Sequence, residues 1–301
     1  MKQPDTADTN VRDTAFLGSA GRSRPLAFSS SPEAHYDRVT DAWKYFMGSD
    51  LHVGYFDGLH DNLQKATQAL TALMVESAHV GPKSAVLDVG CGTGNPAIHL
   101  ARAAGCRVTG ISTSQVCVDR ANANAAEHGL EGRVSFSVAD GTCTGFSERS
   151  FDCVWVMESS HLMPNKLQLL QECARVLREG GTLVLCDLAL RRPMPAQPPV
   201  QLLYDLVVLE QVFGKASLQT IEEYINQCTS VGIDATGRDI SEQVAPTFRS
   251  WGRNARECAA MATDLIGEKQ VDLFIRGCEI MSRLFREGQL GYCLLAGVKL
   301  E

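Results

Sequence analysis

Residues 86–96 read Val-Leu-Asp-Val-Gly-Cys-Gly-Thr-Gly-Asn-Pro, and they give the clearest indication of the fold. An apolar run leads directly into three glycines at alternate positions, Gly90, Gly92 and Gly94, and a helical pattern follows. Glycine adopts positive φ without strain and, having no Cβ, lets a ligand approach the backbone closely. The stretch therefore predicts a strand, a tight turn that faces a ligand, and then a helix.

The same alternation of short β-rich runs and helical runs continues after this turn. Strands that alternate with helices of roughly 10 to 15 residues predict a parallel sheet with crossover helices on both faces, and right-handed crossovers make it doubly wound. We therefore expect an α/β fold with a mostly parallel seven-stranded sheet. The expected strands cover residues 85–89, 107–111, 134–139, 151–156, 181–187, 233–240 and 291–300, and the first helices cover 96–105, 114–128 and 166–178.

The chain of 301 residues divides into three expected parts. Residues 1–30 are rich in Ser, Thr, Asp and Gly and are expected to be flexible. Residues 31–80 show helical patterns, the second of them beginning after Asn62, and predict an N-terminal helical cap. Residues 81–301 form the expected core, with cap insertions at about 190–215 and 243–288. The first insertion begins at a proline-rich break and carries a helical pattern at 199–213, and the second carries two between 245 and 287. A further helical pattern at 217–228 lies between the two insertions.

Small polar and acidic residues stand at the ends of the first three expected strands, where open parallel sheets bind their ligands. The turn has the spacing GxGxG rather than the GxGxxG of dinucleotide sites, and Asp88 before it would repel a pyrophosphate. Ser112, with Gln115, takes the place of the usual ribose-binding carboxylate, and Asp140 with Gly141 is placed to meet an adenine. The pattern favours a cationic or zwitterionic nucleoside such as S-adenosylmethionine, which carries a sulfonium and an ammonium group.

At these residues the chain resembles the class I S-adenosylmethionine-dependent methyltransferases. It is most similar to the small-molecule branch that includes sterol and tocopherol methyltransferases and the rebeccamycin sugar O-methyltransferase. The resemblance covers the chain from about Tyr36 to the C-terminus, and four segments carry it: residues 52–56, 86–96, 107–112 and 158–164.

The resemblance implies a Rossmann-like fold and a set of donor-binding residues. An aromatic segment before the first strand would fold over the methionine part of the donor, through Tyr36, Tyr55 and Trp43. Packing of these aromatic residues against the N-terminal helix is the alternative. The full donor-binding set that we expect is Tyr36, Tyr55, Asp88, Gly90, Gly92, Gly94, Ser112, Gln115, Asp140, Gly141 and Glu158.

The loop after the fourth strand, which carries Glu158 and His161, should lie beside the methyl acceptor. Methyl transfer is an in-line displacement that depends on correct placement of the nucleophile. Because histidine has a reference pKa of about 6.5, His161 is a candidate base for a hydroxyl proton, with Asp187 as the residue that orients its imidazole. The resemblance implicates histidines of this loop together with this aspartate. The O-methyltransferase pattern has two adjacent histidines, however, whereas Leu162 follows His161 here, and a structural hydrogen-bonding role for His161 stays open.

A carbon acceptor is the main alternative to an oxygen acceptor. An alkene that attacks the sulfonium forms a cation, which a carboxylate or an aromatic face stabilises. Glu210, Tyr204, Phe213 and Trp251 in the inserted segments are candidates for that role, and Tyr204 is our preferred substrate contact. The helix expected at 199–213 is apolar on more than one face, so it is packed core, pocket lining or a subunit contact.

Composition excludes several other classes of protein. The net charge of −7 and the lack of a dense Lys/Arg run argue against a nucleic-acid substrate. No apolar run is long enough to span a bilayer, and the N-terminus has no signal-peptide core. Eleven cysteines without a CxxC pair or a metal-ligand cluster predict reduced thiols in a cytoplasm and no metal site.

We therefore expect an enzyme that methylates a small, largely apolar specialised metabolite on oxygen or carbon. Terpenoids, prenylated alkaloids, glycosides and polyketides are the acceptor classes that the resemblance implies. The apolar cap helix is a candidate surface for self-association. The alternatives are N-methylation of a small amine, a donor-binding protein without turnover, and an NAD-dependent reductase with an atypical turn.

Overall fold

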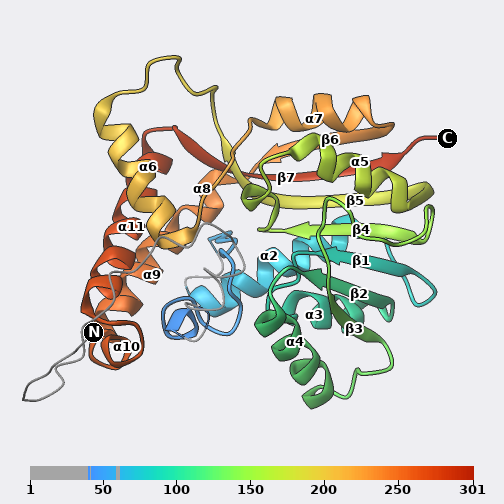
Figure 1. Ribbon diagram of the computed structural model, residues 1–301, viewed down its shortest axis with the longest axis horizontal. Helices are drawn as coiled ribbons and strands as arrows, with labels where there is room; N and C mark the ends of the chain where they lie inside the picture. Colours follow the sequence, from blue (N-terminus) through green and yellow to red (C-terminus); the bar gives the residue numbers. More distant parts are fainter. Residues whose placement is uncertain (1–39, 41, 59–61) are drawn as a thin grey trace, which may run out of the picture.

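The computed structural model describes residues 40, 42–58 and 62–301. A seven-stranded sheet forms the centre of the molecule, with strand order β3-β2-β1-β4-β5-β7-β6. Neighbouring strands from β3 to β5 run parallel, whereas β7 runs antiparallel to both β5 and β6. The expected doubly wound, mostly parallel sheet is confirmed (Figure 1). Its strands are β1 (Ala85–Val89), β2 (Arg107–Ser112), β3 (Val134–Val138), β4 (Phe151–Met157), β5 (Leu177–Leu190), β6 (Ile233–Asp239) and β7 (Leu290–Lys299).

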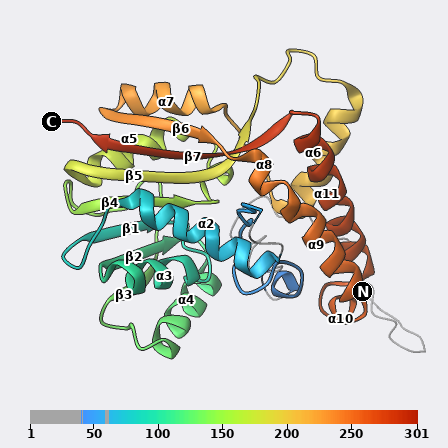
Figure 2. The ribbon, with the colours of Figure 1, turned by 180° about the vertical axis from the view of Figure 1, so that it is seen from behind.

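Helices cover both faces of this sheet, and each face has its own apolar core. α2 (Leu63–Ala78), α3 (Asn95–Ala104) and α4 (Gln115–Glu127) pack on one face, around Val86, Val108 and Trp155. α5 (Lys166–Val176) and α7 (Ile221–Ser230) pack on the other, around Leu87 and Val156. Figures 1 and 2 show these two layers from opposite sides.

Local capping explains where several of these helices begin. The side chain of Asn62 accepts the N–H of Lys65, so α2 begins where the sequence predicts. α7 begins four residues later than the pattern from residue 217 suggests. Thr220 and Glu223 form a capping box that satisfies the free N–H groups at that point.

A second group of helices lies beyond the sheet, and we call α6 and α8–α11 the outer helices. They are α6 (Val200–Phe213), α8 (Ser241–Val244), α9 (Pro246–Glu257), α10 (Ala259–Ile266) and α11 (Glu268–Arg286). Two long helices were expected between residues 245 and 287, but α9, α10 and α11 are separate helices. The backbone leaves helical geometry at Cys258 and takes φ +84° at Gly267.

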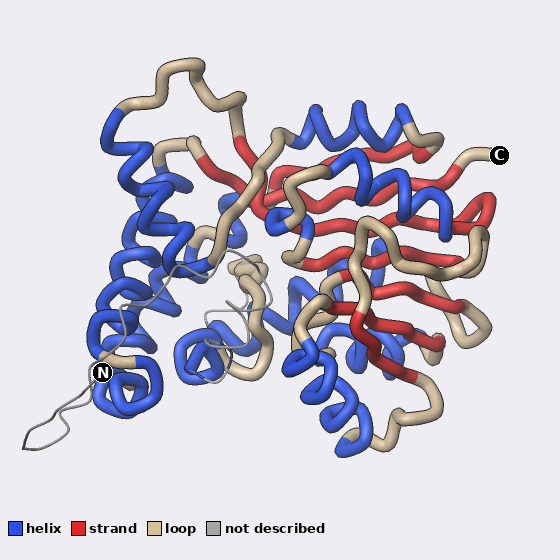
Figure 3. Tube along the Cα trace, viewed as in Figure 1, coloured by secondary structure: helices blue, strands red, loops and turns tan. Residues whose placement is uncertain are grey.

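The outer helices stand at the end of the sheet where β1 and β4 finish (Figure 3). β5 and β7 extend toward them, and α11 packs on α6, α9 and α10. In the described part of the chain, none of the helices combines the length and the apolar character that crossing a bilayer requires.

Candidate active site

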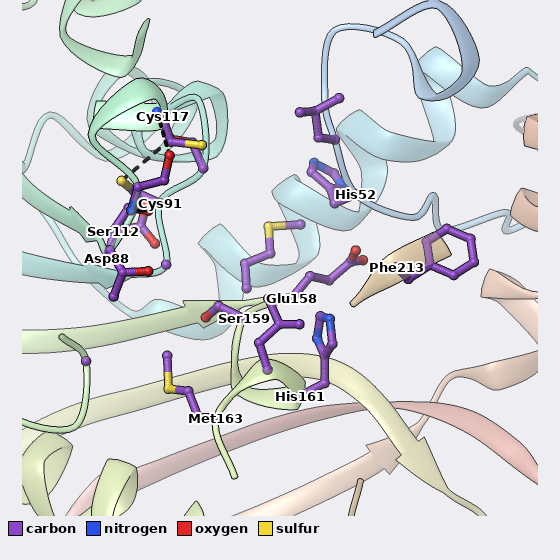
Figure 4. Close-up of a pocket in the computed structure, with 18 of the residues that line it drawn as sticks. His52, Asp88, Cys91, Ser112, Cys117, Glu158, Ser159, His161, Met163 and Phe213 are labelled. Atoms are coloured by element: carbon purple, nitrogen blue, oxygen red, sulfur yellow. Dashed lines mark hydrogen bonds between the residues drawn. The ribbon is translucent and has the colours of Figure 1, made fainter. Parts of the chain in front are cut away.

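A cavity of about 540 Å³ lies between the carboxyl ends of the strands and the outer helices. Its volume falls within the range of ~300–1,000 Å³ that is usual for small-molecule sites. Figure 4 shows two ends: a glycine-turn end with Asp88, Cys91, Ser112 and Cys117, and a histidine end with His52, Glu158, His161 and Phe213. The sheet reverses its strand order between β1 and β4, so the cavity occupies the place where doubly wound sheets bind ligands.

The three glycines of the turn have different surroundings. Gly90 has φ +83°, and a Cβ on it would lie 2.1 Å from the Cβ of Ser159. Gly94, at φ +84°, faces Phe136, whose ring would lie 2.7 Å from an added Cβ. Gly92, at φ +52°, lines the cavity, and its Cβ would meet no atom within 4 Å. The backbone at Gly92 is therefore open to a ligand, whereas Gly94, which we expected to bind the donor, serves helix packing and does not line the cavity.

Asp88 lines the cavity directly below this turn and is 2% exposed. Burial disfavours the charged carboxylate and raises the pKa of Asp88 to about 7. A cation bound beside it would favour ionisation, so the site suits a positively charged ligand better than a pyrophosphate.

The ends of β2 and β3 supply the rest of the glycine-turn end. Ser112 and Asp140 line the cavity, and the Asp140 Oδ1 is fixed by the N–H and hydroxyl of Thr142, both at 2.8 Å. Gly141 also lines it, and a Cβ there would lie 2.5 Å from Val89 Cγ1. Gln115 was wrongly placed: its side chain is exposed and donates to Asp119 at 2.7 Å, because the first turn of α4 points it away from the cavity.

The segment before α2 closes one side of the cavity with Trp43, Leu51, His52 and Val53. Tyr55, an expected donor contact, does not line it. Tyr55 packs half-buried against the core, and its N–H donates to Ala66 O at 2.8 Å, which fixes the backbone in that position. Tyr36 lies outside the described residues.

Glu158 lines the cavity with an unusual backbone of φ +48°. Its Oε1 accepts the N–H of Val53 at 2.9 Å and the hydroxyl of Tyr292 at 2.7 Å. Burial raises the pKa of Glu158, although nearby His52 and these hydrogen bonds oppose the shift. Glu158 thus connects β4, β7 and the segment before α2.

His161 and Asp187 form a buried pair at the histidine end. The Nδ1 of His161 lies 2.7 Å from Asp187 Oδ1, and Asp187 Oδ2 accepts the backbone N–H of His161 at 2.8 Å. Burial lowers the pKa of His161, but the charge and hydrogen bond of Asp187 outweigh it, and the net shift is upward. Burial likewise opposes ionisation of Asp187, yet His161 and further hydrogen bonds lower its pKa. With Nδ1 turned to Asp187, Nε2 is the imidazole nitrogen left for a molecule in the cavity.

The outer helices give the histidine end an aromatic wall. Phe213 and Trp251 line the cavity as expected, with ring centroids 6.3 Å apart, and Trp43 stands 6.0 Å from Phe213. Tyr204, which we preferred as the substrate contact, does not line the cavity. It is 47% exposed on the outer face of α6, where the guanidinium of Arg276 lies 5.1 Å from its ring. Glu210 is also exposed and does not line the cavity.

Several residues of the cavity were missed from the sequence. Phe248 and Met281 line it from α9 and α11, and Tyr292 reaches Glu158 from β7. Their positions carry no local pattern beyond ordinary core residues, because the fold brings them to the site from far along the chain. His52 lies in a quoted segment of the resemblance, and that was the signal that could have found it.

Comparisons with known proteins found relatives of this chain. Residues 86–181 match a family described as a methyltransferase domain. The 27-O-demethylrifamycin SV methyltransferase of Amycolatopsis mediterranei is 33% identical over 88% of this chain and 95% of its own length. A probable chloroplastic tocopherol O-methyltransferase of Oryza sativa subsp. japonica is 32% identical over 70% of this chain and 62% of its own. Among solved structures, the cyclase SpnF superposes with a TM-score of 0.76 at 25% identity, covering 89% of this chain and 95% of that one.

Proposed function

Because this chain belongs to the class I S-adenosylmethionine-dependent methyltransferases, we propose that it methylates a hydroxyl oxygen of a small, largely apolar specialised metabolite. The observation that carries the proposal is the His161–Asp187 pair at 2.7 Å, which leaves Nε2 facing a cavity with an aromatic wall. A base is needed only when the acceptor must lose a proton, as a hydroxyl does.

The glycine-turn end fits the donor. Gly92 offers open backbone, Asp88 favours a nearby cation, and Ser112 and Asp140 stand where ribose and adenine would lie. When bound, S-adenosylmethionine supplies an electrophilic methyl group on a sulfonium. We propose that the outer helices and the segment before α2 act as a cap that keeps water from this group.

The histidine end then holds the acceptor. The Nε2 of His161 takes the hydroxyl proton, and the ionised Asp187 stabilises the imidazolium that forms. Phe213 and Trp251 pack against the apolar body of the acceptor and place its oxygen in line with the methyl group. The relatives' names support oxygen as the acceptor atom, since both reported relatives are named for O-methylation or an O-demethylated substrate.

Carbon methylation is the second candidate. The Glu158 carboxyl and the Phe213 and Trp251 rings line the same end of the cavity, and such groups stabilise a carbocation. An amine acceptor has less support, because the described wall on this side is mainly apolar and aromatic.

The test is transfer of a deuterated methyl group to a panel of hydroxylated polyketides and terpenoids, with the product read by mass spectrometry and NMR. We expect an O-methyl product, and we expect His161→Ala to lower turnover by about 10²-fold while donor affinity is kept. An unchanged rate in H161A would favour carbon methylation instead. Absence of any affinity for S-adenosylhomocysteine by calorimetry would contradict the donor site itself.

Two further expectations remain proposals. The exposed apolar side chains of α6 support self-association, and they are Val200, Leu203, Tyr204 and Val207. Sedimentation velocity would measure the oligomeric state. The eleven cysteines are all unpaired thiols, which supports a reducing compartment such as the cytoplasm.

A further inference from the structure

Two hydroxyl groups stand behind the His161–Asp187 pair, and the proposed reaction leaves both unused. The Ser160 Oγ lies 2.6 Å from Asp187 Oδ2, and the Tyr224 hydroxyl lies 2.8 Å from the Ser160 Oγ. Ser160, Tyr224 and Asp187 are each 0% exposed. Tyr224 belongs to α7, so the chain of contacts runs from the cavity to the helix layer on one face of the sheet.

The direction of these hydrogen bonds follows from the chemistry of the groups. Asp187 is ionised and can only accept, so Ser160 donates its single proton to it. The Ser160 oxygen is then an acceptor for the Tyr224 hydroxyl. Burial and the charge of Asp187 raise the pKa of Tyr224 well above its usual range, so Tyr224 keeps its proton and stays a donor. Both O–H groups thus point toward the carboxylate.

Asp187 is thereby fully occupied. Oδ2 accepts from the Ser160 hydroxyl and the His161 N–H, and Oδ1 accepts from the Leu188 N–H at 2.7 Å and faces His161 Nδ1. A carboxylate has about four such positions, and a buried one is costly unless they are filled. Filling three of them with fixed donors leaves the fourth for the imidazole and so fixes the ring's tautomer and direction.

We propose that Ser160 and Tyr224 are positioning residues that hold Asp187 as a fixed, ionised carboxylate, so that His161 presents a free Nε2 to the acceptor and binds its proton only moderately. The proposal rests on the proposed function of His161 as the base. Ser160 donates a positive O–H end that offsets part of the charge that His161 feels from Asp187. Tyr224 strengthens this donation, because hydrogen bonds in a chain polarise one another.

Other charged groups around His161 set the background for this effect. Asp187 on β5 and Glu158 after β4 raise the pKa of His161, and Lys166 at the start of α5 lowers it. The Lys166 ammonium donates to Met163 O within the loop that follows His161. Tyr292 on β7 contacts Glu158 rather than His161. Removing the Ser160 hydroxyl leaves Glu158 and Lys166 in place and leaves the charge of Asp187 less compensated.

The test is an NMR titration of the His161 imidazole in the full chain labelled with ¹⁵N-histidine. The His161 signals are assigned by their loss in His161→Asn. We expect Ser160→Ala to raise the pKa of His161 by about half to one pH unit, and Tyr224→Phe to raise it by less. The acid limb of kcat/KM should move to higher pH by the same amount, with KM little changed.

Thr182→Val is the matched control. Thr182 lies on the same strand as Asp187, and its hydroxyl donates to Ala78 O at 2.9 Å, far from the pair. Its loss should lower the melting temperature without moving the pKa of His161.

Each outcome has a distinct meaning. If S160A and Y224F lower the melting temperature as T182V does and the pKa of His161 stays at the wild-type value, the two hydroxyls are structural only and the proposal is overturned. The titration needs no turnover, so it is independent of the acceptor. A full methylation rate in H161A would contradict the proposed role of His161 as the base, but it would not change the result of the titration.

Discussion

His161 is subject to opposing influences whose balance sets the pH range of the reaction. Burial lowers its pKa and Asp187 raises it, with a net shift above the ordinary value of 6.5. A general base acts in its deprotonated form, so the active fraction is small below that pKa and grows as the pH rises through it.

We therefore predict that kcat/KM rises with pH and levels off above the raised pKa of His161, rather than near 6. The measurement is methyl transfer between about pH 5.5 and 9 at saturating donor. Calorimetric titration of the donor over the same range separates any effect of Asp88, whose pKa is about 7. A flat profile would show that no proton needs to leave the acceptor.

Gly92 provides a second test at the scale of one residue. In Gly92→Ala the new Cβ occupies the cavity, and the φ of +52° adds strain. We expect donor affinity to fall by at least about 10-fold, together with a loss of about 1 kcal/mol in the free energy of unfolding.

Gly129 is the matched control for that substitution. It has φ +66° and open space around its Cβ position, but it does not line the cavity. Gly129→Ala should lose similar stability and keep the wild-type affinity for S-adenosylhomocysteine. Equal affinities in the two variants would show that the ligand does not approach Gly92.

At the scale of elements, Glu158 connects the segment before α2 to the sheet. Its Oε1 accepts from Val53 N–H and from the Tyr292 hydroxyl, and a hydrogen bond to a charged acceptor contributes about 1.5–3 kcal/mol. We predict that Glu158→Ala accelerates hydrogen exchange at the Val53 amide by about 10-fold or more. Glu158→Gln, which keeps an accepting oxygen, should lie between E158A and the wild type.

The exchange rate at Gly54 serves as the internal control. The Gly54 N–H donates to Thr247 Oγ1 on α9 and does not depend on Glu158 directly. If the Val53 amide exchanges equally in E158A and the wild type, other contacts hold this segment in place.

The elements that the sequence predicts well are those whose signals are local. The strands around the glycine turn and the helix capped by Asn62 follow from apolar runs and a side-chain cap, whereas the Thr220 cap was missed and α7 begins later than expected. What could not be predicted is which face of a helix meets the cavity. α6 is apolar on more than one face, so its own sequence does not separate the exposed Tyr204 from the cavity-lining Phe213. Only packing against α11 and the segment before α2 decides it.

The same distinction applies to the site. Asp88, Ser112 and Asp140 could be placed because each follows a strand directly, and parallel strands bring their carboxyl ends to one edge. The Ser160 and Tyr224 hydroxyls could not, because 64 residues separate them along the chain and only the sheet topology joins them. Tyr55 and Gln115 show that lying beside the right element does not turn a side chain into the cavity.

At the scale of the whole molecule, three parts of the chain line the cavity. The sheet supplies the glycine turn, the outer helices supply Phe248 and Trp251, and the segment before α2 supplies Trp43. A ligand that contacts all three binds only the folded chain. Its binding must therefore stabilise the whole chain by mass action.

The pKa of Asp88 makes this stabilisation depend on pH. Burial raises it from 3.8 to about 7, so in the free protein the stability linked to this group is present below pH 3.8 and is lost as the pH rises through 7.

A ligand with an ammonium group near Asp88 prefers the ionised carboxylate, which is the minor form at pH 6 and the major form at pH 8. We predict that the affinity for S-adenosylhomocysteine rises by about 10-fold from pH 6 to pH 8, and that a concentration of 100 times the Kd raises the melting temperature by about 5 °C. NADH, whose pyrophosphate would face the same carboxylate, should produce no shift, and a larger shift with NADH would mean that the turn between β1 and α3 binds a dinucleotide.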